Sequence, residues 1–278
     1  MTANGKTFFL MAILTALFVY VGGMVGGSSG ALLAFVFAAG MNLYSYWFSA
    51  DMVLKRYRAS EIGPEHPSGL YQLIERLASQ GGLPMPRVFV VPESTPNAFA
   101  TGRNPENAAV AATEGILRLL DRGELEGVMA HELAHIRNRD MLTGTIAATF
   151  AGALTMLGQF GRFAGGSGRN RNPLGGLLLV IGAPLAAMFL RMAISRTREY
   201  AADRGGAEIS ANPLGLANAL HKLQHGVAKY PIETGRPSDS HLFIVNPFLG
   251  GLSKLFSTHP PIEERIRRLE SMAERGDY

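Results

Sequence analysis

The sequence predicts a mainly helical α+β protein that is anchored in a membrane and has a small β-sheet beside a histidine-bearing helix. Three observations predict this architecture. No charged side chain occurs between Lys6 and Asp51, and this stretch is long enough for two membrane spans. Two short apolar runs, at 87–91 and 107–112, are typical of buried strands. Further along, two histidines four residues apart lie in a segment whose apolar residues recur at helical spacing.

Residues 1–50 are expected to form an N-terminal transmembrane hairpin. It would consist of two spans and a Gly/Ser-rich turn, near 7–21, 31–48 and 22–30. Lys6 precedes the hairpin, its tip has no charge, and three basic residues follow it: Lys55, Arg56 and Arg58. Because Lys and Arg favour the cytoplasmic side, both ends of the hairpin are expected in the cytoplasm. A cleaved signal peptide is the alternative for the first span, although the second span would still anchor the chain.

Residues 51–141 are expected to form the first part of a cytoplasmic domain. The apolar pattern predicts a helix, two strands, an edge strand or loop between them, and a second helix that begins at a capping box of Asp121 and Glu124. The first four of these elements are expected at 68–80, 87–91, 107–112 and 97–102. The histidine-bearing segment falls within the second helix.

Residues 142–190 are expected to form a second hydrophobic hairpin that also spans the membrane. Its tip is rich in arginine, which goes against the positive-inside tendency, so a shallow or protein-buried arrangement is the alternative. Residues 191–278 would complete the cytoplasmic domain with helices at 214–229 and 261–275. The net charge of +4 and the pI near 9.5 are explained by basic residues that flank membrane segments, so no nucleic-acid partner is expected.

His131 and His135 would project from one face of a helix, close enough to hold one ion. Imidazole nitrogen suits zinc, and Glu132 is placed to take a proton from water that the metal activates. Two incidental histidines are the alternative interpretation. A second pair, His221 and His225, has the same spacing but lacks a following glutamate, and it is interpreted as surface histidines.

A catalytic zinc site needs a third protein ligand, for which Glu199 is the candidate. Glu199 and Asp203 share one helical face, so one can bind the metal while the other orients a ligand histidine from behind. A solvated ion-pair face with Arg196 and Arg198 is the alternative. A second hairpin that crosses the membrane and returns would bring Glu199 to the same membrane face as the histidine pair, which favours the ligand role.

Five blocks of sequence are distinctive: HELAHIRNRD at 131–140, NAFATG at 97–102, REYAAD at 198–203, LFIVNP at 242–247 and STHPP at 257–261. Together they resemble the HtpX family of membrane-integrated zinc metalloproteases. The resemblance implies a gluzincin-type protease domain, one Zn²⁺ per chain held by His131, His135 and Glu199, and a relationship to CAAX prenyl endopeptidases. It also implies an endopeptidase of the cytoplasmic (inner) membrane that acts in stress response and in quality control of misfolded or damaged membrane proteins.

Two further parts of the chain contain candidate site residues. The stretch containing Asn97, Ala98 and Phe99 looks like the family's substrate-binding edge, along which an extended peptide could add as a strand. His259 is a candidate oxyanion-stabilising or outer-sphere donor, and the alternative is that it caps the final helix.

A catalytically inactive metal-binding scaffold and a small transporter are the rival functions. The presence of Glu132 argues against the first, and the shortage of ionisable residues in the spans argues against the second.

Overall fold

The computed structural model describes residues 3–142, 144, 146, 196–229, 242–244 and 260–278. The chain divides into two compact units, one comprising Met1–Trp47 and Thr143–Ala193 and the other Phe48–Leu142 and Ile194–Tyr278. The assignment of these stretches to membrane and cytoplasm remains a prediction. The second hydrophobic hairpin, at 142–190, lies almost entirely outside the described residues.

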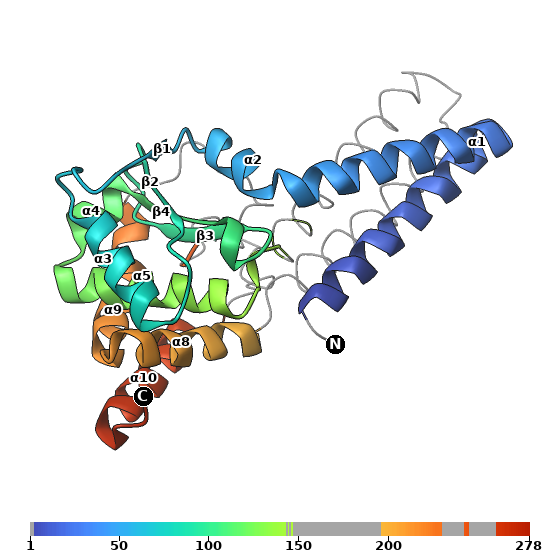
Figure 1. The fold of residues 1–278 in the computed structure, drawn as a ribbon. Coiled ribbons are helices and arrows are strands. Elements are labelled where there is room, and N and C mark those ends of the chain that lie inside the picture. Colours follow the sequence, from blue (N-terminus) through green and yellow to red (C-terminus); the bar gives the residue numbers. More distant parts are fainter. Residues whose placement is uncertain (1–2, 143, 145, 147–195, 230–241, 245–259) are drawn as a thin grey trace. The chain divides into compact units, whose positions relative to one another are not determined.

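The first unit contains one long apolar helical element, α1 (Ala3–Trp47), which bends back at Gly26 and Gly27. Gly27 has a φ of 60°, a conformation that glycine adopts without a steric penalty. Its two arms run side by side (Figure 1), and the Nδ2 of Asn42 on one arm donates to the Oγ1 of Thr15 on the other at 2.9 Å. By length and composition, Thr7–Met24 and Gly26–Trp47 are both able to span a membrane.

The second unit is built on a four-stranded sheet of β1 (Ser60–Glu61), β2 (Arg87–Val91), β3 (Ala98–Gly102) and β4 (Ala108–Thr113). The strand order is β1-β2-β4-β3, with β2 and β4 parallel and the two outer pairs antiparallel. Strands at the predicted positions are therefore present. The two-residue β1 was not predicted, because so short a pairing leaves no periodic pattern in the sequence.

Helices lie on both faces of this sheet, with α2 (Ser49–Arg56) in one core and α3 (Leu70–Gln80) and α5 (Arg122–Arg137) in the other (Figure 1). Three further helices, α8 (Arg196–Ser210), α9 (Pro213–Lys229) and α10 (Ile262–Arg275), pack against α5 or against one another. The short helix α4 (Glu114–Leu119) follows β4, and a 3₁₀ turn at Pro105–Asn107 precedes that strand. Alternate strand residues belong to two different cores, as the two-residue period of a strand requires. Val110 and Ala98 pack in the core shared with α3 and α5, whereas Phe99 packs with α2 and Phe243. The predicted fold class, mainly helical α+β with a small sheet, is confirmed.

The helix α5 lies at the centre of the larger core and carries the histidine pair. Its N-terminus is fixed by the predicted capping box, in which Glu124 N donates to Asp121 Oδ1 and Asp121 N donates to Glu124 Oε2. Nearly all of its residues from Glu124 to Ile136 are buried. The reciprocal cap and the burial fix the position of this helix, and therefore of the side chains that it directs toward the sheet edge and α8.

Candidate metal centre

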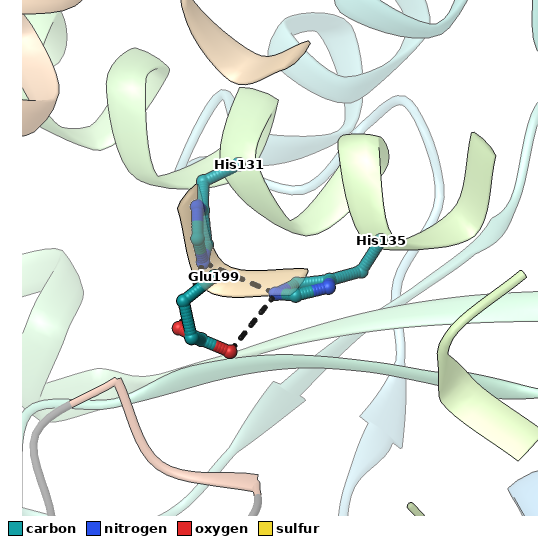
Figure 2. Close-up of side chains that lie close together, drawn as sticks. All are labelled: His131, His135 and Glu199. Carbon is teal, nitrogen blue, oxygen red and sulfur yellow. Dashed lines mark hydrogen bonds and ion pairs between the residues drawn. The ribbon is translucent and has the colours of Figure 1, made fainter. Parts of the chain in front are cut away.

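His131 and His135 project from α5 toward Glu199 on α8 (Figure 2). The Nε2 atoms of the two imidazoles lie 3.2 Å apart. The carboxylate of Glu199 approaches both rings, with Oε1 at 3.7 Å from Nε2 of His135 and Oε2 at 3.9 Å from Nε2 of His131. The structure thus brings together three donor groups, although Glu199 follows His131 by 68 residues in the sequence.

A glycine allows α8 to come this close to α5. An added Cβ on Gly206 would lie 2.8 Å from the backbone nitrogen of His131 and 2.9 Å from its Cα, which real side chains do not permit. The close backbone approach therefore requires glycine at this position. It also places Glu199 and Asp203, seven and three residues earlier on α8, on the face that meets the histidines.

Each candidate ligand histidine has a carboxylate behind it. Asp203 Oδ1 lies 3.1 Å from Nδ1 of His131, and Asp140 Oδ2 lies 3.4 Å from Nδ1 of His135. A carboxylate on Nδ1 holds the ring so that Nε2 faces the metal and makes that nitrogen more basic. The structure therefore places Asp203 behind His131. The partner of the second histidine, Asp140, was not assigned a role from the sequence.

Arg265 on α10 is a further residue of the site that sequence reasoning missed. Its side chain is fully buried, donates from Nη2 and Nε to Asp203 at 2.7 and 2.9 Å, and places Nη1 3.5 Å from Glu199 Oε2. Although burial on its own would raise the pKa of the Asp203 carboxyl, the charge of Arg265 lowers it. One signal was present in the sequence: Arg265 lies on the helical face formed by Ile262, Ile266 and Leu269, where a charged residue is unusual.

Glu132 is buried beside the pair and is bound to the sheet. Its Oε2 accepts a hydrogen bond from the backbone N–H of Ala100 in β3 at 2.9 Å. Burial raises the pKa of the Glu132 carboxyl, an effect that the nearby His131 and His135 oppose. Burial alone would lower the pKa of His135, but Asp140 and the charges of Glu199 and Glu132 raise it to about 9. The site thus favours retention of a proton when no metal competes for it.

The three donor groups fit a tetrahedral divalent ion. Donor atoms on one zinc ion are roughly 3.3 Å apart, given metal–donor distances of roughly 2.0–2.1 Å. The separations between the donors here, 3.2, 3.7 and 3.9 Å, need only small side-chain movements to reach that value. Two imidazoles and one carboxylate are also the donor set of a catalytic zinc site, which leaves one position for water or substrate.

The other predicted candidates differ in what surrounds them. The side chain of Asn97 donates to the carbonyl of Leu242 at 2.9 Å and accepts from the N–H of Ile244 at 3.2 Å, so it fastens that segment to the sheet. Phe99 is buried against Tyr57, with ring centroids 5.7 Å apart. Because these two side chains are engaged within the protein, a peptide at β3 would contact the backbone of the strand, which also includes Ala98.

The other histidines considered from the sequence are the second pair and His259. His221 and His225 are exposed on α9, and Nδ1 of His225 contacts the carbonyl of His221 at 2.9 Å. Among the described residues, the one cluster of histidines and carboxylates with metal-ligand geometry is that of His131, His135 and Glu199. His259 lies outside the described residues.

This chain resembles known proteins over most of its length. The model of peptidase family M48 matches residues 65–273. The chain is 56% identical over 274 residues to a protease HtpX homolog of Salinibacter ruber, and 54% identical over 279 residues to one of Ralstonia pickettii, with 98% of each chain covered. The crystal structure of S. mikatae Ste24p has a similar fold, with a TM-score of 0.53 at 17% identity over 95% of this chain and 65% of that one. This chain therefore belongs to peptidase family M48, in its HtpX group.

Proposed function

We propose that this chain is a zinc metalloendopeptidase with one Zn²⁺ held by His131, His135 and Glu199. The observation that carries the proposal is the convergence of three metal-ligand groups with a buried carboxylate, Glu132, in a chain of a peptidase family. Bound zinc would supply Lewis-acid chemistry, which activates water and polarises a peptide carbonyl.

The residues of the chain have separate roles in this proposal. Glu132 takes a proton from the attacking water and returns it to the leaving amine. Asp203 and Asp140 hold the two imidazoles in the ligand orientation through Nδ1. Arg265 compensates the charges of Asp203 and Glu199, which would otherwise repel one another in a buried site.

We propose that the substrate is an extended peptide that adds as a strand to β3. Among the described strands β3 ends the sheet, and its neighbour Glu132 belongs to the catalytic helix. Strand addition uses backbone hydrogen bonds and therefore accepts many sequences, as expected for a protease that acts on misfolded chains. All five residues of β3 are buried, so part of the surrounding chain must move before a peptide can reach the strand.

The proposed setting is the cytoplasmic (inner) membrane, with a multi-pass chain whose protease domain faces the cytoplasm. The two apolar arms of α1 and the basic residues that follow them support this orientation. The proposed substrates are misfolded or damaged membrane proteins, which would reach the protease from the same bilayer. Reporter fusions after Tyr57 and within the 22–30 turn test the orientation, since the first should be cytoplasmic and the second external.

The experiment that tests the activity compares purified full-length variants in detergent with an unfolded protein as substrate. The parent protein should cleave with zinc and stop with a chelator. Glu132→Gln should keep its zinc and lose at least roughly a hundredfold in rate, because the general base is gone. Glu199→Ala should lose zinc on dialysis, whereas the exposed control His221→Ala should keep it. Cleavage by zinc-loaded Glu132→Gln at the parent rate would refute the mechanism.

A further inference from the structure

The alternation of β3 identifies which of its backbone groups face away from the sheet. Asn97, next to the strand, faces β4, since its N–H donates to Thr113 Oγ1 and its carbonyl accepts from Thr113 N. Successive residues of a strand face opposite edges, so Ala98 and Ala100 direct their N–H groups away from β4. The N–H of Ala100 meets Glu132 Oε2 at 2.9 Å, consistent with this alternation.

Glu132 therefore occupies a position where a substrate strand would place a carbonyl. A peptide that pairs with this edge of β3 can use the N–H of Ala98, but at Ala100 the donor is already bound to the general base. The hydrogen-bond ladder between substrate and sheet is therefore interrupted at Ala100, where the carboxylate of the general base Glu132 takes the place of a substrate carbonyl.

We infer that the backbone N–H of Ala100 is a positioning group that holds Glu132 against β3 and thereby fixes which peptide bond of a bound strand is cleaved. This inference rests on the proposed function. Glu132 is 6% exposed, and the bond to Ala100 N anchors one carboxylate oxygen, which orients the other relative to the histidine pair. Catalytic groups need such support, because a displacement of about 1 Å can cost roughly a hundredfold in rate.

Proline substitution tests the inference because it removes one backbone N–H. At positions whose N–H faces away from the neighbouring strand, proline costs no ladder bond to β4. Ala100→Pro removes the donor to Glu132, and Ala98→Pro is the matched control that removes a donor of the same edge two residues away. Both variants are assayed as full-length, zinc-loaded protein in detergent, with zinc content measured after dialysis.

Ala100→Pro should keep its zinc and its KM to within about twofold, while kcat falls about tenfold or more and the cleavage sites spread along the substrate. Ala98→Pro should raise KM and leave kcat and the cleavage sites unchanged. A rise in KM for Ala100→Pro, with kcat and cleavage sites unchanged, would show that this N–H belongs to the substrate ladder. An inactive parent protein would overturn the proposed function as well, whereas an active parent and an unaffected Ala100→Pro would overturn this inference alone.

Peptide binding provides a readout that does not depend on turnover. In a Glu132→Gln background, a fluorescent extended peptide should bind Ala98→Pro several-fold more weakly and Ala100→Pro within about twofold of the background protein. The reverse order would overturn the inference. If Ala100→Pro does not fold, the parent protein with singly N-methylated peptides replaces it. The N–H groups needed for cleavage should then lie at one fixed offset from the cut in every peptide, and an offset that varies between peptides would contradict a fixed register.

Discussion

Replacing Arg265 by methionine tests whether the charge at the centre of the site is structural. Arg265 is fully buried, makes two hydrogen bonds to Asp203 and lies 3.5 Å from Glu199. Methionine retains much of the apolar stem but removes the guanidinium, so Asp203 would remain as a buried carboxylate without its strongest partner. The contact also ties α10 to α8, which carries both acids.

The expected loss is large because the pair is buried. Removing one partner of a buried, hydrogen-bonded ion pair costs about 3–5 kcal/mol, whereas removing both can be nearly neutral. A change of 1 kcal/mol moves the Tm of a domain of 150–250 residues by about 2–4 °C. Arg265→Met should therefore lower the Tm of the metal-free protein by roughly 6–20 °C, and Arg265→Met with Asp203→Asn should recover most of this loss.

Thermal unfolding of the metal-free protein in detergent measures this prediction, with the four proteins of the double-mutant cycle side by side. The pair of substitutions should show a coupling of several kilocalories per mole. If Arg265→Met shifts the Tm by less than about 2 °C, or if the losses of the two single variants simply add, the pair does not stabilise the fold as argued. An exposed arginine whose partner is also exposed, such as Arg118, serves as the control and should change the Tm little.

Three further predictions concern neighbouring features. Gly206→Ala should push α8 away from His131 and weaken zinc binding about tenfold or more in a competition assay, whereas Gly205→Ala, whose nearest atom is the mobile end of Arg137, should have a smaller effect. Because the pKa of His135 is raised to about 9, zinc must displace a proton from this residue below that pH. The apparent affinity for zinc should therefore rise by up to tenfold per pH unit between about 6.5 and 9, and calorimetry in buffers of different ionisation enthalpy should detect the released proton. Asn97→Ala should lower the Tm by several degrees, because the N–H of Ile244 loses its partner; an unchanged Tm would show that this tether is weak.

Local patterns were sufficient to predict the elements that hold the site. The charge-free N-terminal stretch predicted the helical hairpin, whose bend falls inside the predicted turn. The capping box predicted where α5 begins, and the four-residue spacing predicted that His131 and His135 share a face. These features depend on residues within one or two helical turns of each other, which is the range that a sequence pattern reports.

The parts that were missed depend on contacts between distant segments or on unusual backbone geometry. Arg265 meets Asp203 across 62 residues of sequence, and its place on the apolar face of α10 indicates burial but not the partner that it contacts. Asp140 reaches His135 because Arg139 adopts a φ of 59°, which turns the chain back after α5. Nothing in the residue type of Arg139 predicts a left-handed conformation. The side-chain amide of Asn97 donates to a backbone segment 145 residues away, a contact that the sequence did not indicate.

The buried charges explain why this arrangement suits a divalent ion. Glu132, Glu199 and Asp203 are buried carboxylates, and Arg265 is the one guanidinium among the described residues that is fully buried with them. With neutral imidazoles, two negative charges remain uncompensated, and a divalent cation would balance them. Without metal, protons reduce the imbalance, which is consistent with the raised pKa values of His135 and Glu132. Metal and protons therefore compete for one site, and a second buried arginine would halve the negative charge that attracts the metal.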